Sequence, residues 1–209
     1  MYEANAFGRI CYFESRFDKY RPKIAKKWKD QNISGSGILY DLLPHLADQT
    51  FQLFGCPQYI SATLKSQRET NSVCDYFNVK LIYCDFDVVL RASSFAAHTP
   101  FRFYIEGNKG TFIKSGMDVQ ESNLHLDNFN KKDWVSEDIK NSGVFYQNGS
   151  AQTITSVQGD YRCFYNNIAN ALCANGSLLV TVDDAIAVMK LIELVTLSSQ
   201  SNQVIAWST

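Results

Sequence analysis

The segment from Gly35 to Phe54 constrains the fold more than any other stretch of this 209-residue chain. At 100° per residue its leucines fall on one side of a helix and its charged and polar residues fall on the other. The apolar stripe consists of Leu39, Leu42, Leu43, Leu46 and Leu53, and the polar face of Asp41, His45, Asp48 and Gln52. The pattern predicts an amphipathic helix that packs its leucines on a core.

The ends of this helix are marked by glycine and proline. Gly35-Ser36-Gly37 precedes it, and Gly55 with Pro57 follows it. Pro44 would remove a helical hydrogen bond unless it lies in the first turn, where backbone N–H groups have no intrahelical partner. We therefore expect the helix to begin near residues 39–41 and to end at Gly55.

Alternation of apolar and polar residues predicts strands before and after this helix. The predicted strands are residues 8–17, 59–65, 75–83, 86–94, 101–106 and 111–114, and Gly107 to Gly110 is typical of a hairpin turn between the last two. Residues 18–30 favour a loop or a short helix. Residues 117–156 have weaker periodicity and are compatible with strands or long loops.

The last third of the chain changes to helical spacing. Apolar residues from Tyr161 to Leu172 predict an amphipathic helix that ends near Gly176, and Thr181 with Asp184 resembles a capping box for a final helix to about Ser198. That final helix is apolar almost all round, so we expect it to be deeply packed. The order of elements predicts one α+β domain over residues 1–209, with mostly antiparallel strands.

Composition argues against several classes of protein. A net charge of -1 gives no electrostatic case for binding nucleic acid or an anionic membrane, and no apolar run approaches membrane-spanning length. The six cysteines form no C-x-x-C pair and do not cluster with histidine, which speaks against metal and redox sites. They fit buried thiols in a reducing compartment, so we expect a cytoplasmic protein.

Asp41 and His45 are the strongest candidates for chemistry. Four residues apart on a helix, a carboxylate and an imidazole share a face and can reach the same substrate atom, and histidine changes protonation near neutral pH. The preceding glycines allow close backbone approach, and the helix N-terminus adds a positive dipole end. The alternative is an exposed helix face with an ordinary ion pair, which spacing alone favours. Glu121 and His125 have the same spacing, but we expect a strand or loop there, where the two would not meet.

Other polar and aromatic residues are weaker candidates. Arg16 and Tyr20, with Asp18 and Arg21, could bind hydroxyl or carboxylate groups of a substrate, although a solvated strand end is the alternative. Trp28 could stack on a ring, and Tyr161 could donate a hydrogen bond to a substrate; packing in the core is the alternative for both. No G-x-G-x-x-G, Walker loop or G-x-S-x-G is present, so the chain has no phosphate cradle of its own.

Several of these stretches together resemble the C-terminal domain of the Gfo/Idh/MocA oxidoreductases, the family of glucose–fructose oxidoreductase and inositol dehydrogenase. The block G-x-G-x-x-x-D-x-x-x-H at residues 35–45 is the most specific match. The others are residues 8–10, 14–22, 53–57, the hairpin at 104–111 and the closing helices at 161–198.

The resemblance implies an enzyme whose N-terminal Rossmann domain binds NAD or NADP and which oxidises a sugar, polyol or related alcohol. Asp41 and His45 would be catalytic, together with a lysine of the cofactor domain: His45 would exchange the hydroxyl proton and Asp41 would bind the substrate or orient the base. Arg16, Tyr20, Trp28 and Tyr161 would contact the substrate. The implied fold is an open, mostly antiparallel sheet covered by helices on one face, and the other face commonly forms a homo-oligomer.

The chain departs from the family in one major respect. No dinucleotide fingerprint and no catalytic lysine motif are present. We therefore expect this chain to bind no cofactor by itself and to be inactive in isolation. The alternative is a non-catalytic dimerisation or partner-binding module derived from the family.

Overall fold

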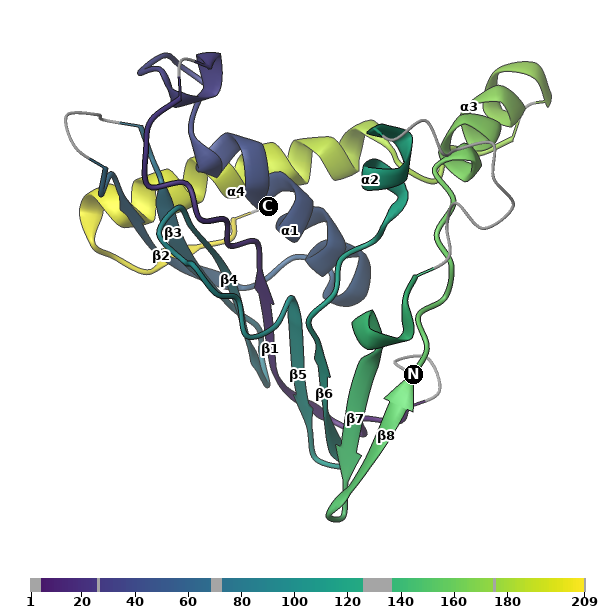
Figure 1. Cartoon of the computed structure of the whole chain (residues 1–209). Helices are drawn as coiled ribbons and strands as arrows, with labels where there is room; N and C mark the ends of the chain where they lie inside the picture. Colours follow the sequence, from purple (N-terminus) through teal and green to yellow (C-terminus); the bar gives the residue numbers. More distant parts are fainter. Residues whose placement is uncertain (1–4, 26, 69–72, 126–136, 175, 209) are drawn as a thin grey trace.

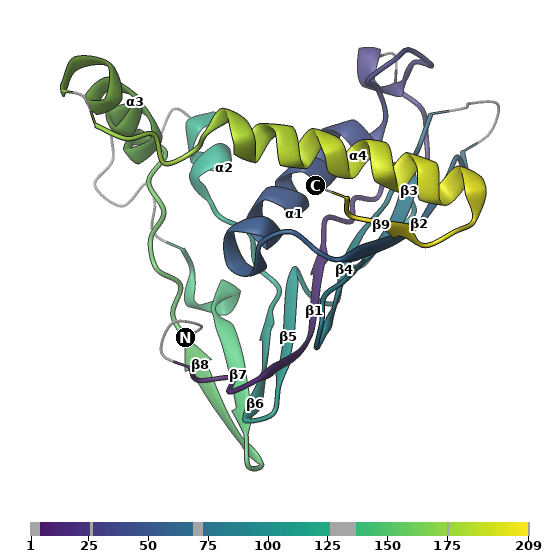
Figure 2. The same cartoon turned by 180° about the vertical axis from the view of Figure 1, so that it is seen from behind.

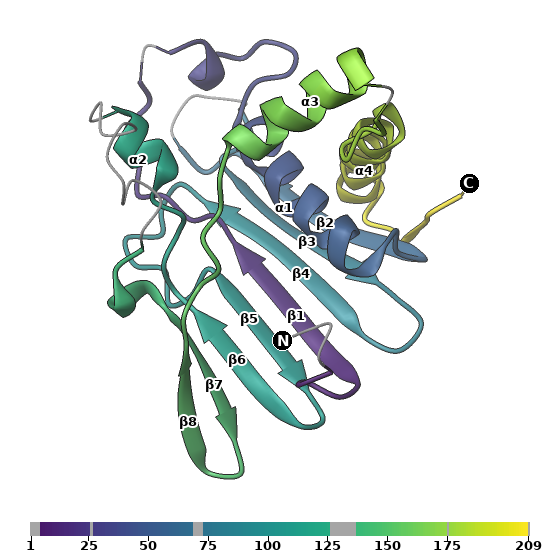
Figure 3. The same cartoon turned by 90° about the vertical axis from the view of Figure 1, so that its right-hand side faces the viewer.

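The strands of the described residues form one open sheet in the order β8-β7-β6-β5-β1-β4-β3-β2-β9 (Figures 1 and 3). This computed structural model describes residues 5–25, 27–68, 73–125, 137–174 and 176–208. The strands are β1 (Ile10–Arg16), β2 (Tyr59–Lys65), β3 (Tyr76–Ile82), β4 (Asp87–Ser93), β5 (Phe103–Gly107), β6 (Gly110–Lys114), β7 (Gly143–Gln147), β8 (Ser150–Ile154) and β9 (Ile205–Ala206).

Neighbouring strands are antiparallel except for β1 and β4, which run parallel. Parallel neighbours need a long connection, and here α1 (Ile38–Phe54), β2 and β3 lie between them in the chain. The predicted α+β class and mostly antiparallel sheet are confirmed. The bounds of β2 coincide with the predicted range, because its apolar and polar residues alternate without interruption.

Helices α1 and α4 (Val182–Ser201) cover one face of the sheet, and the other face carries no helix among the described residues (Figure 2). Four leucines of the predicted stripe are buried, together with Ala47 and Thr50. Leu53 is 37% exposed, contrary to the prediction, because the last turn of α1 packs through Phe51 and Phe54 instead. From the sheet, alternate residues of β3 and β4 complete this core: Phe77, Val79, Leu81, Val88, Leu90 and Ala92.

The expectation that Pro44 lies in the first turn of its helix is wrong. Helix α1 begins at Ile38, so Pro44 lies inside it, beyond the first turn. Proline there has no N–H to offer the carbonyl of Tyr40. Tyr40 lies on the exposed side of α1, where water can satisfy that carbonyl.

The closing helices are present, but they are less buried than expected. Helix α3 (Arg162–Ala174) has no buried residue and projects away from the sheet (Figure 1). The capping box of Thr181 and Asp184 is confirmed. Deep packing holds only for the second half of α4, since Val182, Ile186 and Met189 are exposed and burial begins at Val188. None of the described helices is long and apolar enough to cross a membrane.

The region with weak periodicity contains both kinds of element. A short helix α2 (Gln120–His125) precedes η2 (Ile139–Asn141), and strands β7 and β8 follow; residues 126–136 lie outside the described residues. The short turn η1 (Trp28–Asp30) agrees with the loop or short helix predicted at 18–30. The expectation of buried thiols is wrong: Cys56, Cys84, Cys163 and Cys173 are exposed, and all six cysteines are free thiols.

Candidate active site

The glycine turn before α1 brings two backbones together. Gly37 has φ +84°, and a Cβ atom added there would lie 2.8 Å from the carbonyl oxygen of Cys74. Next to it, the N–H of Ile38 donates to the same oxygen at 2.9 Å. Gly37 is therefore needed because the start of α1 docks on the segment before β3, and the close approach is to protein backbone.

Asp41 is held by a lysine from η1. Lys29 Nζ donates to Asp41 Oδ2 at 2.9 Å and to Oδ1 at 3.2 Å. Both side chains are about one-third exposed. No hydrogen bond joins Asp41 to His45, both of which the structure describes, so the predicted pair shares a helix face without bonding to each other.

His45 is exposed and lines a pocket of about 340 Å³. The centroid of the Phe17 ring lies 6.2 Å from that of its imidazole. The pocket is bounded by the end of β1, the middle of α1, the starts of β5 and α2, and the segments around residues 116 and 158. Its polar lining consists of His45, Gln49, Arg102, Lys114, Asp118, Glu121, Glu137, Ser156, Gln158 and Tyr161.

Lys114 is neutralised within the protein. Its Nζ pairs with Glu137 at 2.8 Å and also donates to Ser156 Oγ at 2.8 Å. These contacts tie the end of β6 to the two chain segments on the far side of the pocket. They fix the pocket wall and leave no net charge on this pair.

Arg102 is the buried cation of the pocket. Its guanidinium donates to Ser15 Oγ and to the carbonyl of Arg16, and lies 4.6 Å from the ring centroid of Phe17 and 4.9 Å from that of Phe103. Burial lowers the pKa of Arg102 to about 10, which still leaves it charged at neutral pH. The pocket therefore contains a fixed positive charge between two aromatic rings.

The structure brings together only some of the predicted site residues. His45 and Tyr161 line one pocket although they are far apart in the sequence. Burial and the nearby acids Asp118 and Glu121 raise the pKa of Tyr161, so its hydroxyl remains a hydrogen-bond donor at neutral pH.

The remaining predicted contacts lie elsewhere, outside the described lining of the pocket. Arg16 pairs with Glu14 at 2.6 Å and lies over the ring of Phe101. Strand alternation places it on the sheet face opposite to Phe13. Tyr20 and Trp28 are 61% and 63% exposed, so packing in the core does not describe Trp28. Substrate contact by Arg16, Tyr20 and Trp28 stays a prediction without support from the pocket.

Sequence reasoning missed most of the pocket. Gln49 follows His45 by four residues and could have been found from helix periodicity. The expectation of a strand or loop around Glu121 is wrong: Glu121 lies in α2 and lines the pocket, and its carboxylate is 3.9 Å from the imidazole of His125 in an exposed pair. Arg102, Lys114 and Glu137 have no local signal, because only tertiary packing brings them to His45.

Comparison with known proteins agrees with this architecture. The model of the oxidoreductase family, C-terminal alpha/beta domain, matches residues 1–207. The chain belongs to the Gfo/Idh/MocA oxidoreductase family. It is 36% identical over 191 residues to the uncharacterized oxidoreductase YdgJ of Escherichia coli, covering 90% of this chain and 55% of YdgJ.

A second relative carries a named activity. Identity is 31% over 201 residues with the scyllo-inositol 2-dehydrogenase (NADP(+)) IolW of Bacillus subtilis, covering 94% of this chain and 56% of IolW. Among solved structures, the putative oxidoreductase yvaA of Bacillus subtilis superposes with a TM-score of 0.92 at 29% identity, covering 99% of this chain and 60% of yvaA. The chain thus spans little more than half the length of these relatives.

Proposed function

We propose that this chain is the substrate-binding and catalytic part of an NAD(P)-dependent oxidoreductase that acts on a sugar, polyol or related alcohol. One observation carries the proposal: His45 opens onto a polar pocket of about 340 Å³, on the same helix face as Asp41. That volume is at the lower end of the usual range for small-molecule sites. The name of IolW, a dehydrogenase of a cyclic polyol, supports the substrate class.

In this proposal His45 acts as the general base. Its imidazole takes the proton of the substrate hydroxyl as the neighbouring C–H hydrogen leaves as hydride, and it returns the proton in the reverse direction. Asp41 lies one helical turn before His45, outside the described pocket lining, and hydrogen-bonds a substrate hydroxyl. The Tyr161 hydroxyl and the Gln49 amide lie in the same lining and orient the remaining hydroxyls.

The described residues do not fit a dinucleotide cofactor by themselves. Among the described residues one pair of strands is parallel, β1 with β4, and α1 lies between them in the chain. In the turn before α1, Gly37 packs on the backbone of Cys74. The close approach at Gly37 is thus made by protein backbone and not by a phosphate group. We therefore place the nicotinamide, which accepts the hydride when bound, on a separate domain.

Exposed apolar side chains mark a face on which that domain could dock. Phe164, Tyr165 and Leu172 on α3 are at least half exposed, as are Val182 and Ile186 at the start of α4. These side chains belong to two consecutive helices, and exposed apolar groups gathered in this way are typical of a surface that meets another protein domain. The proposed docking face is therefore the exposed side of α3 together with the first half of α4.

The test uses the completed enzyme: this chain with the cofactor-binding domain encoded before it or, failing one, with that of IolW joined to its N-terminus. Reduction of NAD or NADP is followed against a panel of inositols, other polyols and aldoses. His45→Asn is expected to lower kcat by about 10²- to 10⁴-fold. His98→Asn is the matched control, because His98 is exposed and outside the described pocket lining.

Normal turnover by the His45→Asn enzyme would contradict the catalytic role. Tight binding of NADP(H) with no turnover of any alcohol would instead favour the non-catalytic module. Cofactor binding by this chain alone would contradict the assignment of the cofactor to a separate domain.

We also propose that the helix-free sheet face joins two copies of the chain. Strand register places Glu14, Val89 and Lys80 in one row across this face, and Tyr104 and Ile113 extend the row on the other side of β1. Tyr104, Val89 and Ile113 offer aromatic and apolar groups on this open face, and aromatic residues are enriched in protein interfaces.

A further inference from the structure

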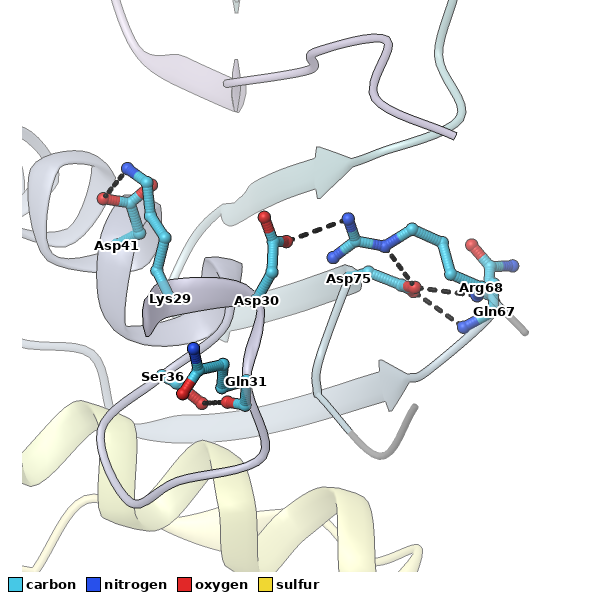
Figure 4. A network of polar contacts seen from close by, with 8 residues as sticks. All are labelled: Lys29, Asp30, Gln31, Ser36, Asp41, Gln67, Arg68 and Asp75. Atoms are coloured by element: carbon cyan, nitrogen blue, oxygen red, sulfur yellow. Dashed lines mark hydrogen bonds and ion pairs between the residues drawn. The ribbon is translucent and has the colours of Figure 1, made fainter. Parts of the chain in front are cut away.

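We propose that Lys29 is a positioning residue for Asp41, and that an ion cluster of half-buried Asp30 with buried Arg68 and Asp75 fixes Lys29 in place (Figure 4). The inference rests on the proposed function, because it assumes that Asp41 acts on the substrate. It assigns a role to a part of the chain that lies outside the pocket lining.

The contact between Lys29 and Asp41 fixes the carboxylate in one orientation. One ammonium group reaches both carboxylate oxygens, at 2.9 and 3.2 Å. The backbone repeats the link, since the N–H of Gly37 donates to the carbonyl of Lys29 at 3.0 Å. Lys29 and the start of α1 are therefore joined by main chain and side chain together.

Asp75 is the centre of the supporting cluster. Its carboxylate accepts hydrogen bonds from the backbone N–H of Gln67 at 2.7 Å and of Arg68 at 2.8 Å, and it pairs with Arg68 Nε at 3.2 Å. The side chain of Asp75 is 1% exposed and that of Arg68 is 4% exposed. Charges so far from water interact strongly and tolerate little displacement.

Arg68 links Asp75 to η1. Its Nη1 pairs with Asp30 Oδ1 at 2.9 Å. Asp30 directly follows Lys29, so the cluster fixes the backbone from which the lysine extends (Figure 4). A series of contacts therefore runs from Asp75, just before β3, through Arg68 to Asp30, and the neighbouring Lys29 contacts Asp41.

Packing alone does not explain how η1 is held. It has no buried residue, and its tryptophan is largely exposed. Burying an ion cluster is costly, and here the cluster anchors an exposed turn. The turn places Lys29 beside Asp41. Because the carboxylate of Asp41 pairs with Lys29, it does not pair with the imidazole of His45. The base is thus left available to the substrate.

The experiment is a double-mutant cycle in the completed enzyme. Lys29→Met is expected to lower kcat by about 10- to 100-fold, the loss typical of a slightly misplaced catalytic group. Lys29→Arg keeps the positive charge and its guanidinium can bind both oxygens of the Asp41 carboxylate, so kcat should stay within about threefold of the wild type. Once Asp41→Asn has removed the carboxylate, adding Lys29→Met should cost less than about twofold more.

One further variant controls for general effects, and another tests the ion cluster. Lys140→Met, in η2 and outside the described pocket lining, removes an exposed pair of similar length, 3.0 Å to Asp138, and should leave kcat unchanged. Asp30→Asn weakens the contact with Arg68 and should lower kcat by about threefold. A thermal melt of each variant confirms that it is folded.

The outcomes separate this inference from the proposed function. Full activity of Asp41→Asn would overturn the role of Asp41, and with it the proposed function. If Asp41→Asn is impaired but Lys29→Met keeps wild-type kcat, only the positioning role is lost. Multiplying losses in the double variant would also overturn it, since a purely structural lysine acts independently of Asp41. An unchanged kcat in Asp30→Asn would remove the cluster from the proposal.

Discussion

The ring of Phe17, directly after β1, lies beside the imidazole of His45 in the middle of α1, with 6.2 Å between the ring centroids and 45° between the ring planes. The same ring contacts two cations: Arg102 at 4.6 Å and Lys19 Nζ at 4.8 Å from its centroid. Phe17 therefore connects the end of the central strand, the proposed base and the buried cation of the pocket.

Replacing Phe17 by leucine should affect both stability and catalysis. The two cation–π contacts are lost, which we expect to lower the free energy of unfolding by about 1–2 kcal/mol. The imidazole and Arg102 also lose a shared wall, so kcat/KM should fall by about tenfold. Urea unfolding and steady-state kinetics measure the two effects. Phe101→Leu is the matched control: its ring lies under Arg16 and outside the described pocket lining, so only stability should change.

Gly37 and Gly35 should respond differently to alanine. Both have positive φ, but a Cβ at Gly37 would meet the Cys74 backbone, whereas nothing lies within 4 Å of one at Gly35. Gly35→Ala should cost about 1 kcal/mol of conformational strain. Gly37→Ala should cost about 3 kcal/mol, because the start of α1 must also move. Equal losses in denaturant unfolding would show that contact with the Cys74 backbone has no energetic consequence.

The thiol of Cys74 should make the protein less stable at alkaline pH. Burial raises the pKa of Cys74 from 9.0 to about 11 in the folded chain. Between these two values the unfolded chain releases the thiol proton while the folded chain keeps it, so the free energy of unfolding falls as pH rises. The fall amounts to about 2–3 kcal/mol across the window.

The comparison with Cys74→Ala isolates this contribution, because other ionisable groups titrate alike in both proteins. From pH 9 to pH 11 the free energy of unfolding of the wild type should fall more than that of Cys74→Ala. A constant difference, measured by urea unfolding at each pH, would contradict the raised pKa.

The proposed interface on the helix-free sheet face predicts the behaviour of Val89→Glu. Val89 lies between Glu14 and Lys80 in one row of this face. The new carboxylate lies beside Glu14, and the added negative charge should repel the same face of the second copy. The expected result in light scattering is a monomer in place of a dimer. Ile139→Glu, at a position that is 73% exposed in η2, should leave the mass unchanged. A wild-type protein that is monomeric in light scattering would contradict the proposed interface.

Local patterns were sufficient for the individual elements. Period-two alternation located β2, β3 and β4, and the leucine stripe identified which side of α1 faces the sheet. The same patterns misjudged α3 and the start of α4, because an apolar stripe shows that a face can be buried but does not show what covers it. Residues 120–125 were missed because a six-residue helix is too short for a periodic signal.

The sequence by itself determined the α+β class and the family resemblance, and it placed Asp41 and His45 on one helix face. Each of these depends on residues close together in the chain. Only the tertiary structure decided that His45 shares a pocket with Arg102 and Tyr161, and that Asp41 is held by Lys29. Such contacts depend on strand order and on where loops dock, and both are set by packing between segments distant in sequence.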